Sequence, residues 1–457
     1  MTTIEACIAS HAAQQPDKLA IVCGADRCTY AALHARIEAE MAARQTLAAG
    51  DATPARPADA CDKAAVVPLR AEPSADFLAS YFALHRLGLV AAPLARDMAG
   101  EVFKRVADKL RMYRCPPGTA DVLYTTGTTG QAKGVMVSHA AIMADAENLI
   151  AGQGYTSNLG FVVSGPLNHI GSLSKVYPVL MLGATLIIVD GLKDLAAFFS
   201  AFDTDLGTEQ KKYATFLVPA SIRILMQLAP ERMAALASRL DFVETGAAAM
   251  ARADMERLCT LLPTTRLYNT YASTETGIVC THNFNDGAPD PQLVGNPLPH
   301  SRVTITDDGL IACGGRTLMT GYVGDEEGTG NVLRGGMVYT RDVGAIDSEG
   351  RLRLLGRQDD VINVGGYKVA PTEVESAALG HPCVADCVCT ATDHKIMGKA
   401  LRLLVVQAPG TTLDKRSLAR FLSERLEAYK VPTAYEQVDS IHRTFNGKID
   451  RKHYQRG

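Results

Sequence analysis

The sequence has no tryptophan among its 457 residues, so any aromatic pocket must use tyrosine, phenylalanine or histidine. It also lacks an excess of charge, since 46 basic and 49 acidic residues give a formal net charge of −3. So balanced a chain has no overall field that would draw it onto nucleic acid or an anionic membrane. No apolar run reaches the roughly 18 residues that a membrane span needs. We therefore expect neither nucleic acid nor membrane as a partner, and any nucleotide must be bound locally.

Paired cysteines are also missing. The eleven cysteines are scattered, with no C-x-x-C pair and no secretion signal before them, which predicts reduced thiols in a cytoplasmic protein. The one cluster comprises His381, Cys383, Cys387 and Cys389. A metal site would need paired short spacings, whereas alternation with valines favours a buried strand.

What is present indicates a soluble globular protein of two or three domains, with 47% hydrophobic and 21% charged residues. Helical stretches separate short apolar runs, a pattern typical of a doubly wound, mostly parallel α/β sheet. The runs cover 161–163, 184–189, 214–218, 242–243 and 266–268. Earlier, strands at 66–69 and 89–94 bracket a helix at 77–87, and residues 309–342 predict short antiparallel strands. In such sheets ligands lie beyond the carboxyl ends of the strands.

Residues 122–139 form the most informative stretch. Two apolar runs flank a loop rich in threonine and glycine that ends in Lys133 and Gly134. Glycines let backbone N–H groups approach an anion, while hydroxyls and a lysine add donors and charge. A P-loop would need G-x-x-x-x-G-K-[ST] followed by a helix, but an apolar run follows Gly134. The loop therefore predicts phosphate binding of another kind.

This loop resembles the signature [Y]-T-[ST]-G-[ST]-T-G-x-P-K-G of the adenylate-forming superfamily, which includes acyl- and aryl-CoA ligases, luciferases and peptide-synthetase adenylation domains. Only the proline differs, being Ala132 here. The resemblance implies ATP binding by Thr125, Thr126, Gly127, Thr128, Thr129, Gly130 and Lys133. Only 27 residues separate Leu94 from Val122, fewer than in the family, which implies a shortened first subdomain.

Residues 165–171 resemble the P-L-F-H-x-x-G segment of acyl- and aryl-CoA ligases, with Asn168 replacing the aromatic residue. The resemblance places His169 between the carboxylate pocket and the thiol entrance, as a gate and donor, with a structural histidine as the alternative. Amino-acid-activating relatives have an aspartate near here to pair the α-ammonium group. No acidic residue lies between Gly165 and Tyr177, which argues against an α-amino acid substrate.

Two further segments match the nucleotide site. Residues 245–249 resemble G-G-A-P, which implies adenine packing on Gly246, Ala247 and Ala248, and Asn269 is assigned to the same site. Residues 271–275 resemble Y-G-x-T-E. There Tyr271 would stack on adenine beside Ala272, Thr274 would reach the phosphate, and Glu275 would hold Mg²⁺.

The last third of the chain supplies the remaining motifs. Asp342 matches the acidic residue of T-G-D and would bind the ribose hydroxyls, although Arg341 replaces the glycine. Residues 356–363 match G-R-x-D-D-x-I-K, so that Arg357 would reach ribose or phosphate and Asp359 would be a hinge. Gly365 and Gly366 would line a thiol path. Residues 443–451 resemble the N-G-K-I-D-R turn, with Lys448 at its tip as a catalytic residue.

Together the motifs imply a large α/β adenylation domain over 1–357 and a small, mobile α+β domain over 358–457. They imply an enzyme that uses ATP and Mg²⁺ to activate an aryl or short acyl carboxylic acid as an acyl-adenylate, then transfers it to a thiol. The acceptor is CoA or the phosphopantetheine of an acyl carrier protein. A non-catalytic relative that only binds nucleotide or acyl-adenylate is the other alternative. We expect a monomer or homodimer.

Overall fold

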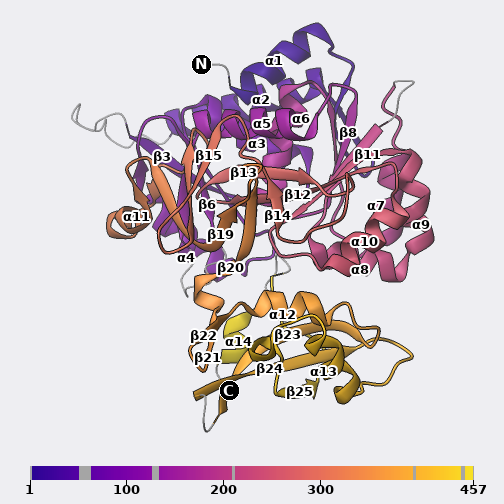
Figure 1. The fold of residues 1–457 in the computed structure, drawn as a ribbon. Coiled ribbons are helices and arrows are strands. Elements are labelled where there is room, and N and C mark those ends of the chain that lie inside the picture. Colours follow the sequence, from indigo (N-terminus) through magenta and orange to yellow (C-terminus); the bar gives the residue numbers. More distant parts are fainter. Residues whose placement is uncertain are drawn as a thin grey trace.

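A computed structural model describes residues 3–50, 63–125, 133–207, 212–394, 398–443 and 448–455. Figure 1 shows a large domain above a smaller one, which contains the orange and yellow end of the chain. The α/β fold class predicted from the sequence is confirmed.

An eight-stranded sheet forms the centre of the large domain. Its strand order is β13-β12-β11-β10-β8-β9-β1-β2. The inner pairs are parallel, while β13 and β2 are antiparallel edges. The strands are β1 (Leu19–Cys23), β2 (Asp26–Thr29), β8 (Leu159–Val163), β9 (Thr185–Ile188), β10 (Lys212–Phe216), β11 (Leu240–Gly246), β12 (Arg266–Ser273) and β13 (Gly277–Asn283). The run predicted to Val218 ends at Phe216, because Pro219 opens a helix with Val218 as its N-cap.

Helices cover both faces of this sheet, and successive residues of β11 face opposite sides. Phe242 belongs to one apolar core and Val243 to the other. The first core receives α1 (Ile4–Gln14), α2 (Tyr30–Gly50), α3 (Ala75–Arg86), α5 (His139–Gln153) and α6 (Ile170–Met181). The second receives α7 (Leu195–Ser200), α8 (Pro219–Leu228), α9 (Pro230–Ala235) and α10 (Arg252–Leu261). Ser138 caps α5 by accepting a hydrogen bond from the Ala141 N–H.

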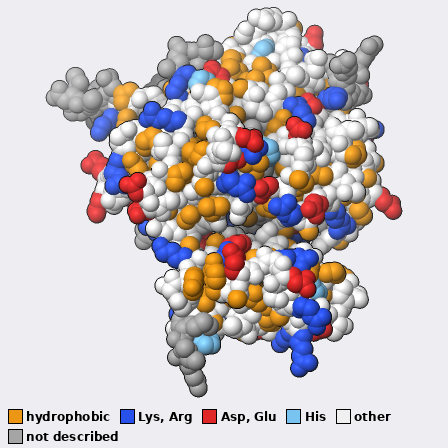
Figure 2. All heavy atoms as spheres, in the orientation of Figure 1, with side chains coloured by type: hydrophobic (Ala, Val, Ile, Leu, Met, Phe, Trp, Pro, Cys, Tyr) orange, Lys and Arg blue, Asp and Glu red, His pale blue; other side chains and the backbone are white. Residues whose placement is uncertain are grey.

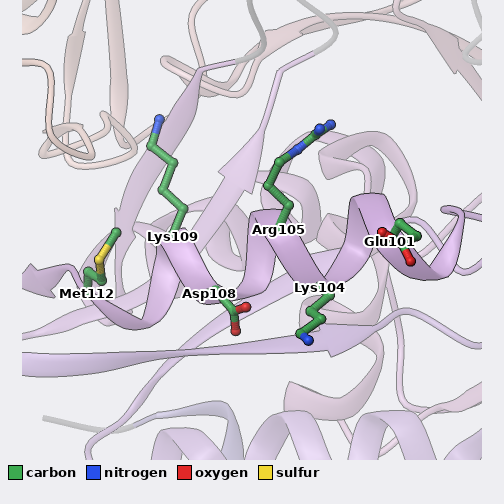
Figure 3. A pocket seen from close by; sticks show the side chains of 6 residues that line it. All are labelled: Glu101, Lys104, Arg105, Asp108, Lys109 and Met112. Atoms are coloured by element: carbon green, nitrogen blue, oxygen red, sulfur yellow. The ribbon is translucent and has the colours of Figure 1, made fainter.

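A second sheet contains both strands of the predicted phosphate loop. Its order is β17-β7-β6-β4-β3-β5. The strands are β3 (Ala64–Arg70), β4 (Val90–Leu94), β5 (Arg114–Cys115), β6 (Thr119–Tyr124), β7 (Gly134–Ser138) and β17 (Gly321–Tyr322). We predicted that 321–322 would join the later antiparallel strands, but it pairs with β7 instead. Helix α4 (Gly100–Arg111) flanks a surface hollow lined by six residues of mixed charge, none of them a predicted site residue (Figure 3).

The predicted antiparallel section is a third sheet, in the order β14-β20-β19-β16-β15, with β18 beside β19. It comprises β14 (Leu293–Gly295), β15 (Ser301–Ile305), β16 (Leu310–Gly315), β18 (Leu333–Arg334), β19 (Met337–Ile346) and β20 (Leu352–Arg357). Helix α11 (Glu326–Val332) precedes β18. This sheet places Asp342 directly opposite Arg357.

The small domain has its own apolar core. The elements of this domain are β21 (Ile362–Val364), β22 (Tyr367–Val369), α12 (Pro371–Ala378), β23 (Val384–His394), β24 (Gly398–Gln407), α13 (Lys415–Ser423), β25 (Ala434–Gln437) and α14 (Arg451–Gln455). Cys387 and Cys389 lie buried in β23, in agreement with the strand predicted there. Within the described residues, no helix has the length and apolar character to cross a membrane. Charges of both signs mix over the face shown in Figure 2.

Candidate active site

The carboxyl ends of β11 and β12 present the segments predicted to bind adenine. Ala247, directly after β11, has a φ of 67°, and it is the one residue other than glycine with positive φ in the described ranges. Gly246 lies so close to β12 that a Cβ atom would stand 2.7 Å from the Thr270 carbonyl oxygen. Gly246 is buried, and a side chain at this position would collide with the backbone of β12, so the close approach of β11 and β12 requires glycine here.

Asp342 is held from two sides. The Tyr271 hydroxyl donates to its Oδ2 over 2.7 Å, and Arg357 Nη1 lies 3.4 Å from its Oδ1. Burial and the Asp342 carboxylate both raise the pKa of Tyr271, so its hydroxyl stays protonated. Asn269 is tied to β14, since its Nδ2 donates to the Leu293 carbonyl over 3.3 Å. The fold thus brings together three residues predicted at the nucleotide, Tyr271, Asp342 and Arg357.

Glu275 and Thr274 lie in the turn after β12. The sequence did not predict that Glu275 contacts Tyr322. The Tyr322 hydroxyl donates to Glu275 Oε1 over 3.0 Å. Lys133 Nζ stands 4.3 Å from the centre of the same tyrosine ring and 3.0 Å from Asp325 Oδ2. Tyr322 therefore connects the predicted metal-binding carboxylate with the predicted phosphate-binding lysine. A G-Y pair is too common a sequence to have signalled this.

The phosphate loop is described only at its ends. Thr126, Gly127, Thr128, Thr129 and Gly130 lie outside the described residues. The Thr125 N–H donates to the Lys133 carbonyl over 3.0 Å, and the Lys133 N–H donates to Thr125 Oγ1 over 3.4 Å. The two ends of the loop are thus clamped together, as a hairpin loop requires.

Lys448 comes from the small domain into this group of charges. Burial and the nearby Arg357 lower the pKa of its ammonium group, while Asp342 and Glu275 act in the opposite direction. These interactions join the two domains at one place. The predicted tight turn at Asn446 and Gly447 lies outside the described residues.

His169 faces the same place from the large domain. It is the N-cap of α6, and its Nδ1 accepts a hydrogen bond from the Gly171 N–H over 3.2 Å. Burial and the positive charge of Lys448 lower the pKa of His169 to about 4, so the ring is neutral near pH 7. A neutral ring can both donate and accept, which suits a residue next to a reacting carboxylate.

The predicted hinge and thiol path lie on the chain segment that leads into the small domain. Asp359, in the 3₁₀ turn Gln358–Asp360, pairs with Arg341 over 2.6 Å, so this arginine points toward the hinge. Gly365 and Gly366 form the exposed turn between β21 and β22, both with positive φ, and the Gly366 N–H donates to Asn363 Oδ1 over 2.9 Å. The roles of all three residues remain predictions.

The sequence also did not predict a buried ion pair between α6 and β11. Lys175 Nζ of α6 lies 2.7 Å from Glu244 Oε1 of β11, and both side chains are 1% exposed. Glu244 precedes Gly246 by two residues, so the two lie on the same face of the sheet. Within the described residues, Glu244 Oε2 has no hydrogen-bond partner. Lys175 is the one charged residue of α6, and this was the available signal.

The sequence model described as "AMP-binding enzyme" matches residues 114–323, and that of the "AMP-binding enzyme C-terminal domain" matches 373–448. The chain belongs to the AMP-binding enzyme family. It is 30% identical over 344 residues to a 3-[(3aS,4S,7aS)-7a-methyl-1,5-dioxo-octahydro-1H-inden-4-yl]propanoyl:CoA ligase of Mycobacterium tuberculosis, covering 74% of this chain and 66% of the relative. It is 29% identical to a feruloyl-CoA synthase of Amycolatopsis, covering 73% and 69%. This AMP-binding chain thus spans about two thirds of the length of such relatives.

A solved structure has the same overall fold as this AMP-binding chain. ATP-bound MatB from Rhodopseudomonas palustris superimposes with a TM-score of 0.84 at 21% identity, covering 100% of this chain and 99% of that one. The likeness confirms the arrangement of a large and a small domain. The boundary near Asp359 stays a prediction.

Proposed function

We propose that the chain is an AMP-forming acid–thiol ligase that activates a carboxylic acid with ATP and transfers the acyl group to a thiol, most simply CoA. One observation carries the proposal. The Tyr271 hydroxyl and the Arg357 guanidinium both contact Asp342, which brings three residues predicted at the nucleotide together, and the charges of Asp342, Arg357 and Glu275 all affect the pKa of Lys448 of the small domain. The CoA ligase names of the relatives support the same reaction class.

In the first step the substrate carboxylate attacks the α-phosphorus of ATP, which forms an acyl-adenylate and releases pyrophosphate. Lys448 stabilises the charge that develops between these groups. Asp342 exchanges its contacts with Tyr271 and Arg357 for the ribose hydroxyls. Glu275 offers the hard carboxylate oxygen that Mg²⁺ prefers, and the ion would neutralise charge on the triphosphate there.

In the second step a thiol attacks the acyl carbon and AMP leaves. For this step we propose that the small domain turns about Asp359, which withdraws Lys448 and brings the Gly365–Gly366 turn to the site. Two adjacent glycines leave room for a thin pantetheine arm. This feature suits CoA and the phosphopantetheine of a carrier protein equally.

The acid is proposed to be an aryl or short acyl acid without an α-amino group. An ammonium group needs a carboxylate partner in a dry site. No acidic residue lies between Gly165 and Tyr177, and the buried Glu244 is already paired with Lys175.

The test is pyrophosphate release over a panel of carboxylic acids, with and without CoA. Release that depends on the acid, with acyl-CoA formed only when CoA is present, supports the proposal. No release with any acid would favour a chain that only binds nucleotide, and transfer only to a carrier protein would favour the other acceptor. Glu275→Gln should lower turnover sharply and regain part of it at high Mg²⁺.

A further inference from the structure

A second cluster of metal-ligating side chains lies away from the proposed active site. Glu5 of α1, His85 of α3 and His139, the first residue of α5, each offer one ligand atom, and these atoms lie within 4.8 Å of one another. Glu5 and His85 are each only 6% exposed. Three separate helices thus bring a half-buried imidazole next to a buried imidazole and a buried carboxylate.

His85 carries the outer partner that metal-bound histidines have. Its Nδ1 lies 2.7 Å from Glu5 Oε1, and its Nε2 lies 3.1 Å from Asp121 Oδ1. Asp121 Oδ2 accepts hydrogen bonds from the hydroxyls of Tyr81 and Tyr177 over 2.8 and 3.3 Å. A carboxylate on the far nitrogen fixes the ring and its tautomer, as in carboxylate–histidine–metal arrangements.

His85 lies between two buried carboxyl groups, with Glu5 Oε1 at 2.7 Å and Asp121 Oδ1 at 3.1 Å. No lysine or arginine hydrogen-bonds Glu5, His85 or Asp121 in the described part of the chain. A divalent cation held between Glu5 and the two histidines would supply positive charge beside these carboxyl groups, which favours its binding.

We propose that Glu5, His85 and His139 bind one divalent transition-metal ion of the zinc type, with Asp121 as the outer partner of His85. Two imidazoles and one carboxylate are a donor set that zinc accepts, and a water molecule completes the tetrahedron. Tetrahedral bonds of about 2.0–2.1 Å place the ligand atoms about 3.3 Å apart, so Glu5 Oε1 and His85 Nδ1, now 2.7 Å apart, would separate slightly around the ion.

The ion would join the N-terminal helices to the phosphate loop. Asp121 lies on β6, which enters the loop, and His139 follows β7, which leaves it. Through these two strands the site would stabilise α1 and α3 against the sheet that carries the loop.

The experiment titrates Co²⁺ into the chelator-treated full-length protein without nucleotide, followed by displacement with Zn²⁺ and a metal count. We expect about one ion per chain and visible d–d absorption without a thiolate charge-transfer band, which separates this site from the cysteines. Glu5→Gln and His139→Asn should each weaken binding at least tenfold, and Asp121→Asn about 10–100-fold. Zn²⁺ should raise the Tm of the unmodified chain more than the Tm of Glu5→Gln or of His139→Asn.

His34→Asn is the matched control, because His34 Nε2 lies 3.7 Å from Glu38 without a second histidine. It should leave Co²⁺ binding unchanged. Two single variants at different helices guard against a folding defect in either one. Absence of stoichiometric binding, a thiolate spectrum, or equal affinity in Glu5→Gln and His139→Asn would overturn the proposal.

Discussion

The inside of each domain and the contact between them are built from different interactions. In the described residues every apolar cluster lies wholly before residue 355 or wholly after residue 361. Between the domains the contacts are ionic, such as Arg223 of α8 with Asp386 of β23 at 3.2 Å. Burial of apolar surface holds a fold together, whereas partly exposed ion pairs separate easily. This difference supports the proposed movement of the small domain relative to the large one.

The largest effect is expected inside the large domain. Lys175→Met leaves Glu244 charged and unpaired in a dry interior, which should lower the free energy of unfolding by about 3–5 kcal/mol. The double variant Lys175→Met, Glu244→Leu should recover most of this loss, because an apolar pair of similar size replaces the ion pair. Urea unfolding of the three proteins measures both effects. Equal stability of single and double variants would show that the pair itself is not the cause.

The second effect concerns the lysine that crosses the boundary. Lys448→Ala should slow acyl-adenylate formation by about 10²–10³, because it removes a donor aimed at developing charge. Transfer from a supplied acyl-adenylate to the thiol should persist. Asp359→Pro should slow the transfer to the thiol and spare acyl-adenylate formation, because proline restricts the backbone rotation at the proposed hinge.

Assays of each half-reaction separate these outcomes. Lys430→Ala is the control, since Lys430 pairs with Glu373 and Glu427 within the small domain. Equal losses in both half-reactions for both variants would contradict a domain that works in two orientations.

A smaller effect is expected at the ionic contact itself. Arg223→Met removes the pair with Asp386, whose partners are 14% and 21% exposed, and also the pair of Arg223 with Asp254 inside the large domain. Asp254→Asn is therefore the control, and the loss of stability beyond that of the control should be about 1 kcal/mol or less. Differential scanning calorimetry of Arg223→Met against Lys175→Met compares the two environments directly. A loss as large as that for Lys175→Met would show that the contact is as firm as a core.

The smallest effect is a shift in one titration. Lys448→Ala removes a positive charge near His169, so the pKa of this histidine should rise from about 4 while burial keeps it below 6.5. NMR of isotope-labelled histidine follows the titration, with His169→Gln to assign the signal. An unchanged pKa would place Lys448 away from His169 in solution.

The sequence predicted linear motifs better than contacts across the fold. Apolar runs separated by helical stretches predicted the parallel sheet, and the motifs predicted the residues that meet at Asp342. The bond from Tyr322 to Glu275 joins residues 47 positions apart, and that from Lys175 to Glu244 joins residues 69 apart. Such pairs depend on how sheets and helices stack, which local spacing does not contain. The strand predicted to reach Val218 ends at Phe216. Here the sequence did contain a local signal, because Pro219 favours the start of a helix.

Ala247 has a consequence for engineering. An alanine held at a φ of 67° stores about 1–2 kcal/mol of backbone strain, and that strain sits where adenine is proposed to bind. Glycine at this position would release the strain and make the nucleotide-free protein more stable. It would also give the segment more conformational freedom before the nucleotide binds. A screen that selects for heat resistance alone would therefore favour a variant that holds its nucleotide less well, whereas a screen for tight nucleotide binding would keep the alanine.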